Sequence, residues 1–500
     1  MVTRTAWPQA WFDDSTAAGT ANSNWGGLKS IAEGGDGIQA GVAEQMQTLF
    51  PDDQIAIFKV SQVSTGISYW MTPNDPGSAG YIALTARIPA LITRLEAQKA
   101  AGEILGYSFE GFFWMQGEQE MDAWNTNSTN LYFKNLKSLV ALIRGLTQTP
   151  ALPAIIGRTS LLYAPSTIRI NDRGDTRPYP QTLPVGDANY RPYEADSEFV
   201  NSPVKRGHAY YEGYSDSVRA AQVGFTFYDA HAAWADADDL PAVDYFHFPN
   251  GAPGKINLGQ RMGRALARLK GATVPAELVL DAGPHRWVHP GTHTLAATVV
   301  SGPANPASVT WALVAGTGAT IESPNALTTN ITVTDPGTYA FQVTATDGGL
   351  RTSRIVNVYV LPAGENLPAY GLAPLYYAPR PGAPVTLVPN IVNPDSDTLT
   401  YTWGQQSTTD PKKRFGQGKM IIDSTNSATP TVRFTWPGAQ VVRLQISDGT
   451  TRSDGNASGW INVPVLVGTD GDTFPDYSAR WSFEEPTYLL AEMNETAPEQ

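Results

Sequence analysis

The sequence predicts a three-layer α/β/α domain with a mostly parallel, flavodoxin-like sheet, followed by two β-sandwich domains of the Ig-like kind. Two observations lead to this fold class. In the first half, short apolar runs alternate with longer segments of helical periodicity, which indicates parallel strands joined by helices. After residue 273, short alternating runs rich in Thr, Val, Pro and Gly replace the helical periodicity. The expected units are residues 1–272, 273–362 and 363–468, with an acidic tail at 469–500.

Four short apolar runs in the first half are typical of buried parallel strands. They are QIAIFKV at 54–60, LGYSFEGFFWMQ at 105–116, PAIIGRTS at 153–160 and VGFTFYDA at 223–230. The second run leads directly into Gln116, Gly117 and Glu118. Because ligands of open parallel sheets bind beyond the carboxyl ends of the strands, this strand end is a candidate functional surface.

Segments with helical periodicity lie between and after these runs. Three of them connect the first strands, and a fourth closes the α/β region. They span residues 40–50, 81–102, 130–148 and 258–271. Strands that alternate with helices of this length indicate crossover connections and therefore a parallel sheet.

The β-rich half contains two similar copies of one pattern. A tryptophan after a threonine recurs at Trp311 and Trp403, and a later Asp-Gly pair recurs at 347–348 and 448–449. Asp-Gly suits the tight turn of a β-hairpin. The two copies resemble the PKD-like and Ig-like repeats of bacterial surface proteins and phage virions.

The composition of the 500-residue chain argues against several functional classes. A formal net charge of −13 with only 34 Lys and Arg residues argues against binding of bare nucleic acid. The absence of cysteine removes disulfides, zinc-thiolate sites and thiol nucleophiles. No apolar stretch approaches the roughly 20 residues of a membrane span, and the N-terminal segment lacks the apolar core of a conventional signal peptide.

Three histidines of the α/β region are candidate catalytic bases: His208, His231 and His247. Without cysteine, nucleophilic catalysis needs a serine or threonine activated by a base, usually a histidine held by a carboxylate. His247 has the most suggestive context, because Asp244 lies three positions before it and a Gly-rich loop and a helix follow. His231 is interpreted as a structural residue at a strand end, and His208 as an ordinary loop residue.

Three blocks of this region resemble one esterase family. WMQGEQE at 114–120 resembles the family block Trp-x-Gln-Gly-Glu-x-Asp, with Glu120 where Asp is usual. IAIFKVSQVSTGISYW at 55–70 resembles a strand that ends in Gly-Gly-Thr-Ser and is followed by Trp, with Lys59, Thr65 and Trp70 in place. The late family block, Asp-x-x-His followed by a Gly-containing loop and a Leu-Gly-x-Arg helix, is matched by Asp244, His247, Leu258, Gly259 and Arg261.

Together the three blocks make residues 30 to 272 similar to the sialate O-acetylesterase-like branch of the SGNH hydrolases. That resemblance implies an α/β/α esterase that removes acetyl groups from sugars with a Ser-His-Asp triad. It implies that His247 takes the proton of a serine and that Asp244 holds the imidazole tautomer. It also implies that the Gln116 amide donates to the developing oxyanion.

The other candidate residues support these roles. Gly117 and Glu118 are expected to support the oxyanion site, and Trp114 belongs to the same supporting set. Trp70, Trp114 and Arg158 are candidate substrate-binding residues. No cofactor or metal ion is expected. A different interpretation of the Gln-Gly-Glu block is a buried polar network that merely closes the strand end.

The chain departs from the family pattern in two places. The family has a first strand followed by Gly-x-Ser-Asn, whose serine is the nucleophile. The nearest match is Ser23-Asn24 in ANSNWGG, which makes Ser23 the candidate nucleophile. However, WFDDSTAAGT at 11–20 is not the apolar strand that should precede it. Val63 also falls where the family has a glycine whose backbone N–H helps form the oxyanion hole.

Three interpretations therefore stay open. The first is an active deacetylase of bacterial surface polysaccharide. The second, favoured for this chain as written, is an esterase-like domain with a degenerate site, kept as a carbohydrate-binding or structural module on a phage virion or cell surface. The third is an unrelated acidic binding module. The expected partners are surface polysaccharide and, through the Ig-like domains, other virion or surface proteins, and the expected location is the virion, cell surface or extracellular space.

Overall fold

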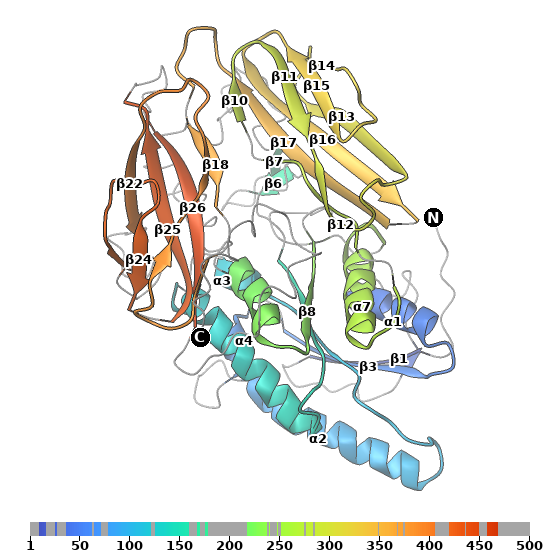
Figure 1. The fold of residues 1–500 in the computed structure, drawn as a ribbon. Helices are drawn as coiled ribbons and strands as arrows, with labels where there is room; N and C mark the ends of the chain where they lie inside the picture. Colours follow the sequence, from blue (N-terminus) through green and yellow to red (C-terminus); the bar gives the residue numbers. More distant parts are fainter. Residues whose placement is uncertain are drawn as a thin grey trace.

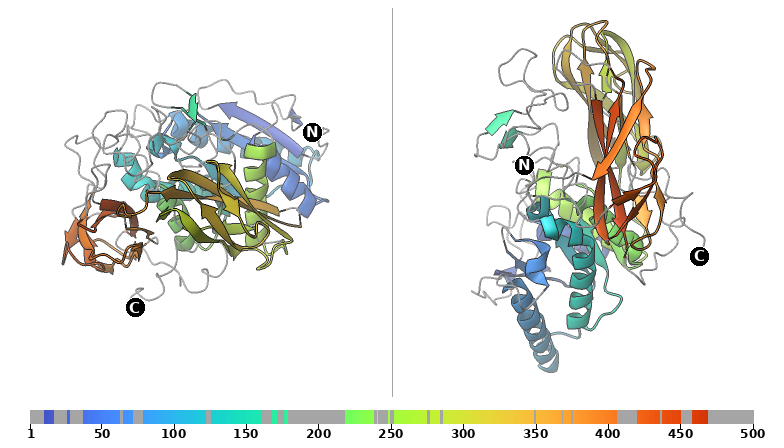
Figure 2. Two further views of the ribbon diagram at one scale, coloured as in Figure 1. Left: turned by 90° about the horizontal axis from the view of Figure 1, so that it is seen from above. Right: turned by 90° about the vertical axis from the view of Figure 1, so that its left-hand side faces the viewer.

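The computed structural model contains an α/β domain and two β-sandwiches, and the sandwiches lie beside each other on one side of the α/β domain (Figure 1, Figure 2). The predicted fold class is confirmed, because parallel strands and helices come first and mainly antiparallel sheets follow. The structure describes residues 10–16, 26–27, 37–62, 65–71, 79–121, 126–159, 168–170, 176–178, 218–237, 240, 248, 252–274, 277–283, 286–348, 350–367, 369–373, 376–405, 420–435, 437–449 and 458–468.

One parallel sheet carries the strand ends of interest. Its strands are hydrogen-bonded in the order β4-β5-β8, with bounds Phe112–Met115, Ala154–Gly157 and Ala232–Ala235. All three run in parallel, so their carboxyl ends lie at the same edge. The strands predicted at 105–116 and 153–160 are confirmed, although β4 occupies only the end of its run.

A second set of strands precedes this sheet in the sequence. β1 (Ala10–Thr16) pairs in parallel with β3 (Ile55–Ser61), and the two-residue β2 (Gly26–Gly27) lies antiparallel on the other side of β1. The strand predicted at 54–60 is confirmed. Residues 11–20 lack the apolar pattern of the strand expected before a nucleophile, yet residues 11–16 of this segment do lie in a strand, β1. Two adjacent aspartates lower the strand propensity of this segment, but backbone ladders on both sides stabilise it.

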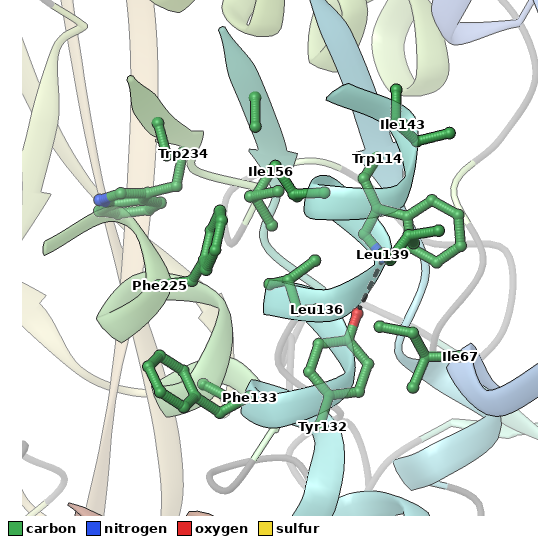
Figure 3. Packing of buried hydrophobic residues seen from close by; sticks show 14 of the residues in the cluster. Ile67, Trp114, Tyr132, Phe133, Leu136, Leu139, Ile143, Ile156, Phe225 and Trp234 are labelled. Atoms are coloured by element: carbon green, nitrogen blue, oxygen red, sulfur yellow. Dashed lines mark hydrogen bonds between the residues drawn. The ribbon is translucent and has the colours of Figure 1, made fainter. Parts of the chain in front are cut away.

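Helices cover both faces of the parallel sheet. The helices are α1 (Ile38–Leu49) and α7 (Asn257–Leu269) on one face, and α2 (Ala79–Ala100), α4 (Thr126–Thr147) and residues 218–228 on the other. Alternate side chains of β5 enter the two cores: Ile155 packs with α1 and α7, whereas Ile156 packs with α4 (Figure 3). This alternation explains why the strand is apolar throughout.

The segment predicted as a strand at 223–230 is largely helical, so that prediction is wrong. The helix spans 218–228 and is buried at every position from Val218 to Phe227. It packs in the same core as α4, and a side chain at Gly224 would meet Leu466 of the second sandwich at 2.2 Å. A helix buried around its whole circumference has no solvent-exposed face, and a short apolar run such as 223–228 cannot be told from a strand by periodicity.

The helix of the late block fits closely against α1 through two glycines. A Cβ added at Gly41 would lie 2.0 Å from the carbonyl oxygen of Ile256, and one at Gly259 would lie 2.0 Å from that of Ile38. The backbones of α1 and α7 therefore touch at positions that tolerate no side chain. Gly259 of the Leu-Gly-x-Arg block has this packing role.

Short elements complete the described part of the α/β domain. They are the 3-10 helix η2 (Ile67–Trp70), α3 (Glu118–Met121), the antiparallel pair β6 (Ile168–Ile170) and β7 (Thr176–Pro178), and the π-helical turn η4 (Ala252–Ile256). No helix in the described residues is long and apolar enough to cross a bilayer.

The two sandwiches repeat one arrangement of strands. The first has sheets ordered β10-β17-β16-β13 and β11-β15-β14, and the second has the equivalent sheets β19-β26-β25-β22 and β20-β24-β23. Two further pairs, β12-β9 and β18-β21, accompany them. The bounds in the first sandwich are β9 Val279–Asp281, β10 Arg286–Val288, β11 Gly291–Ala296, β12 Thr298–Ser301, β13 Ser308–Ala315, β14 Thr320–Ile321, β15 Thr328–Val333, β16 Gly337–Asp347 and β17 Leu350–Val360. Those in the second are β18 Tyr370–Leu372, β19 Tyr376–Ala378, β20 Val385–Thr386, β21 Asn390–Val392, β22 Thr400–Gln405, β23 Met420–Ile422, β24 Thr431–Phe434, β25 Gly438–Ser447 and β26 Ser458–Val467.

The recurring residues of the sequence occupy equivalent places in the two copies. Trp311 on β13 and Trp403 on β22 are buried, and their indole nitrogens donate to the carbonyl oxygens of Ala326 and Ser427 at 3.0 and 2.7 Å. Asp347 is the last residue of β16 and pairs with Leu350, and Gly348, with a φ of 50°, begins the turn to β17. The internal repeat and this predicted hairpin turn are confirmed. The unit boundaries at 272, 362 and 468 stay predictions, and residues 469–500 lie outside the described part.

Candidate active site

The backbone that follows β4 is held by two side chains from other elements. The carbonyl oxygen of Gln116 accepts hydrogen bonds from the Tyr132 hydroxyl at 2.6 Å and from Gln222 Nε2 at 2.8 Å. Tyr132 lies on α4 and Gln222 on the helix at 218–228. Burial raises the pKa of Tyr132 above its ordinary value, so its hydroxyl stays protonated and can donate. The carboxyl end of β4 is thus fixed by the helices of one face.

Gly117 makes this strand end possible. Its φ is 149°, and a Cβ at this position would lie 2.7 Å from both Thr159 Cγ2 and Val218 Cγ1. The chain therefore turns through a conformation that L side chains rarely adopt, at a point where there is also no room for one. Gly117 lies at the carboxyl end of β4, as the sequence predicted, and it allows the backbone to adopt this conformation.

Glu120 connects the end of β4 with the segment after β3. Its carboxylate is 1% exposed and accepts hydrogen bonds from the backbone N–H of Ile67 and from Gln116 Nε2, both at 2.5 Å. A side chain at Gly66 would meet Glu120 Oε1 at 2.6 Å, so the two segments lie in direct contact. Burial raises the pKa of Glu120 to about 7, against the opposing effect of these hydrogen bonds.

The Gln116 side chain faces the same segment. Its amide nitrogen donates to Thr65 O at 3.2 Å as well as to Glu120, so both amide hydrogens are engaged in this arrangement. Its Oε1 atom is buried and has no hydrogen-bond partner among the described residues. The oxyanion role of Gln116 stays a prediction, and it requires one of these hydrogen bonds to be exchanged for the substrate.

A similar network follows β5. Gln222 Oε1 accepts from the backbone N–H and the hydroxyl of Thr159 at 3.0 and 3.2 Å, and the guanidinium of Arg219 donates to Thr159 O. Because Gln222 also bonds to Gln116, one side chain ties together the carboxyl ends of β4 and β5. The polar network that the sequence offered as an alternative for the Gln-Gly-Glu block is present.

Arg158 and Asp236 form a buried ion pair at the same edge. They follow directly after β5 and β8, and Arg158 Nη2 lies 2.6 Å from Asp236 Oδ1. The side chains are 0% and 4% exposed, and the guanidinium stacks over the Trp234 ring at 4.3 Å. Arg158 therefore contacts Asp236 and Trp234 inside the protein, and its expected contact with substrate stays a prediction.

The two tryptophans proposed for substrate binding lie in the core. Trp70 and Trp114 are 3% and 8% exposed and contact each other edge to face, with ring centroids 5.9 Å apart. Trp114 Nε1 donates to the Tyr132 hydroxyl at 3.2 Å (Figure 3). This placement favours packing and support of the strand end, as expected for Trp114, and contact with substrate stays a prediction for both.

Several candidate residues cannot be placed. Ser23, Val63, His208, Asp244 and His247 lie outside the described residues. Glu118 begins α3 directly after Gly117, beside Glu120 in the same short helix. His231 lies in the turn before β8, at the amino end of the strand, where its backbone N–H donates to Asp229. That position agrees with a structural residue.

Sequence reasoning missed several residues at this edge. Glu120, Tyr132, Gln222 and Asp236 carry its hydrogen bonds, but only Glu120 lies within a recognised block. Ser15 was also missed. The backbone of Ser15 pairs with that of Val60 near the carboxyl end of β1. Ser15 is thus the penultimate residue of β1, and its only sequence signal was a serine shortly before the small residues of AAG at 17–19.

Comparisons with known proteins agree with this architecture. Residues 21–180 match the family model of a carbohydrate esterase described as sialic acid-specific acetylesterase, and residues 282–360 match the family model of a PKD domain. The resemblances to an SGNH-type carbohydrate esterase and to PKD repeats are thus confirmed: the chain has a sialate-acetylesterase-like domain followed by a PKD domain. The first match begins after β1 and ends before Asp244 and His247.

Several solved structures are similar to parts of this chain. A carbohydrate acetylesterase from Xanthomonas citri is 11% identical, with 71% of this chain and 73% of that chain covered and a TM-score of 0.32. A protein from Arabidopsis thaliana is 15% identical, with coverage of 53% and 82% and a TM-score of 0.31. A human PKD domain is 26% identical, with coverage of 17% and 83% and a TM-score of 0.16. A comparison with curated proteins gives no match.

Proposed function

We propose that the α/β domain is an active carbohydrate O-acetylesterase that removes acetyl groups from bacterial surface polysaccharide. The observation that carries this proposal is β1, which pairs in parallel with β3 and brings Ser15 to the carboxyl end of that strand pair. The segment after β3 is in turn bonded to Gln116 and Glu120 after β4. A strand that carries a serine near its carboxyl end is the element that the family pattern requires and that no apolar run indicated.

The proposed reaction is an acyl transfer through a serine. The serine hydroxyl attacks the acetyl carbonyl while His247 takes its proton, and His247 then returns a proton to the departing sugar oxygen. Asp244 holds the imidazole. Water then attacks the acetyl-serine ester with His247 again as the base, which releases acetate and restores the serine. The nucleophile is Ser15, because it lies at a strand end, and Ser23 with its Ser-Asn dipeptide is the other candidate.

Acetate release from p-nitrophenyl acetate and from an acetylated glycan tests the proposal. We expect His247→Ala and Ser15→Ala each to lower the rate by at least about 10³-fold, as for other triad residues. Ser23→Ala and His231→Ala should retain the parent rate, and His231→Ala is the matched control because this histidine lies at the amino end of β8. Loss in Ser23→Ala with retention in Ser15→Ala would transfer the role to Ser23. A parent rate no higher than that of His247→Ala would contradict hydrolysis altogether.

A carbohydrate-binding module without hydrolysis is the second candidate. The observation that favours it is that both amide hydrogens of Gln116 are already engaged by Thr65 and Glu120. If the protein has this function, it would bind acetylated glycan but would release no acetate from it. Titration of the glycan in a calorimeter, beside the acetate assay, separates the two functions.

We also propose that the protein works on a virion or a cell surface. The PKD domain and its repeated neighbour support this location, because the repeats resemble modules of such surfaces, and the acidic net charge does not oppose contact with neutral polysaccharide. Mass spectrometry of purified virions and of surface and culture fractions tests the proposal. Recovery from the cytoplasm alone would contradict it.

A further inference from the structure

Asp236 is held from three directions, and one of them is the first sandwich. Arg158 reaches Oδ1 from the end of β5. Arg354 on β17 reaches Oδ2 at 2.6 Å, and its side chain is 11% exposed. Arg261 on α7 donates to the carbonyl oxygen of Asp236 at 2.9 Å. We call Arg158, Asp236 and Arg354 the Asp236 clamp.

The same interface contains a second contact. Arg261 Nη2 lies 3.5 Å from the carbonyl oxygen of Arg351, also on β17. One strand of the sandwich therefore engages both the strand end after β8 and the helix of the late block. Arg261 belongs to the Leu-Gly-x-Arg block, so this arginine joins the esterase-like domain to the sandwich as well as to Asp236.

The surrounding arginines keep Asp236 in its ionised form. Burial alone would raise the pKa of Asp236, but the guanidinium groups of Arg354, Arg158 and Arg261 outweigh burial and hold the pKa well below its usual range. Asp236 is therefore ionised inside the protein. A buried charge that loses one of its partners is strongly destabilised, because the remaining groups cannot replace the lost solvation.

A shift of the Asp236 clamp would move residues that are connected to the candidate catalytic groups. Asp236 is the first residue after β8, and the chain continues from it to Asp244 and His247. Arg158 is the first residue after β5, and the next residue, Thr159, is bonded to the Gln222 that holds Gln116. Asp236 therefore lies at the start of the segment that bears Asp244 and His247, and Arg158 is connected through Thr159 and Gln222 to the backbone of Gln116.

We propose that the first sandwich is a working part of the esterase-like domain and that Arg354 is its positioning residue, which fixes the carboxyl ends of β5 and β8 through the Asp236 clamp. Arg354 acts through Asp236 and Arg158 and does not touch the substrate. The effect on turnover rests on the proposed esterase function, whereas the effect on the strand ends does not.

The test uses the full chain with Arg354→Met, Arg354→Lys and Arg351→Met. Arg351 is the matched control, because it is an arginine on the same strand with an exposed side chain and only its carbonyl oxygen contacts Arg261. Hydrogen exchange measured by mass spectrometry should accelerate in Arg354→Met for peptides that contain residues 154–159 and 232–237. The lysine variant should recover part of the protection, and Arg351→Met should match the parent.

Kinetics on the acetylated glycan give the second measurement. We expect Arg354→Met to lower kcat by about 10- to 100-fold with little change in KM, as for a small misplacement of catalytic groups. Partial rescue by lysine would support positioning. Unchanged hydrogen exchange at both strand ends in Arg354→Met, or faster exchange with an unchanged kcat, would overturn the positioning role of Arg354.

A second variant covers the case in which Arg354→Met does not fold, and hydrogen exchange covers the case in which the parent is inactive. If Arg354→Met does not fold, Asp236→Asn approaches the same contact from the other domain, and the proposal requires it to accelerate exchange at 154–159. If the parent releases no acetate, the proposed function fails, and exchange at the strand ends still decides whether the sandwich holds them. Equal exchange in Arg354→Met and Arg351→Met would then refute the coupling.

Discussion

The two ends of the parallel sheet differ in how deeply their charged side chains are buried. At the carboxyl end, Glu120, Arg158 and Asp236 are almost completely buried and joined by hydrogen bonds from several elements. At the amino end, Arg144 and Asp229 form a partly exposed pair, with side chains 15% and 11% exposed. Burial of charge costs free energy unless each group is paired, so a protein concentrates it where function requires it. The comparison indicates a functional end and a scaffold end.

Gly117→Ala should have the largest effect at the carboxyl end. Its Cβ would collide with Thr159 and Val218 in a backbone conformation that is itself unfavourable, at a cost of about 4 kcal/mol. Gly102→Ala is the matched control, with a φ of 72° and no atom within 4 Å, and should cost only about 1 kcal/mol. Urea unfolding measures both. Equal losses would show that crowding at the strand end is unimportant.

Glu120 should give the carboxyl end a pH dependence. Its pKa is raised from 4.5 to about 7 in the folded protein, so the folded state binds the proton more tightly than the unfolded chain. The contribution of Glu120 to the free energy of unfolding is therefore largest below about pH 4.5, falls by about 3 kcal/mol up to about pH 7, and is level above that.

Glu120→Gln should remove that fall between pH 4.5 and 7, while Glu103→Gln, at an exposed glutamate, should keep it. Urea unfolding at several pH values in this window provides the measurement. Parallel pH profiles for the parent and Glu120→Gln would exclude Glu120 as the titrating group.

Arg144→Met tests the scaffold end. This change removes the ion pair with Asp229 and the hydrogen bonds to the carbonyl oxygen of Leu152, and should cost about 2 kcal/mol. We expect acetate release per folded molecule to stay at the parent value. Lys99→Met, at an exposed pair with Glu96, should leave unfolding unchanged. A fall in turnover by folded Arg144→Met would remove the distinction between the two ends.

Tyr132→Phe should have the smallest effect of the four. It removes the hydroxyl that accepts from Trp114 Nε1 and donates to Gln116 O, at a cost of about 1.5 kcal/mol. Turnover should fall as well, because Gln116 loses one of the groups that hold its backbone. Tyr107→Phe serves as the control, because this half-buried tyrosine donates only to the exposed Glu96 among the bonds described, and it should alter neither property. Loss of stability with full turnover would show that this contact does not serve the site.

Much of the fold was predictable because its signals are local. An apolar run that ends on Gln116, Gly117 and Glu118 identified a strand end, and the recurrence of Trp311 and Trp403 identified the repeated sandwich. The errors have local causes too. The helix at 218–228 is buried on all sides and so lacks an exposed face, and β1 carries two aspartates that obscure a strand.

The sequence by itself determined the order of the domains, the class of the first one and the residues of its recognised blocks, because periodicity and short motifs are properties of neighbouring residues. Only the tertiary structure decided the partners of those residues. Asp236 is held by the arginine that follows β5 and by arginines of α7 and β17, and Glu120 by the segment after β3. Such contacts join residues far apart along the chain, and no local pattern records them, because burial of a charge is settled only when all of its surroundings are in place.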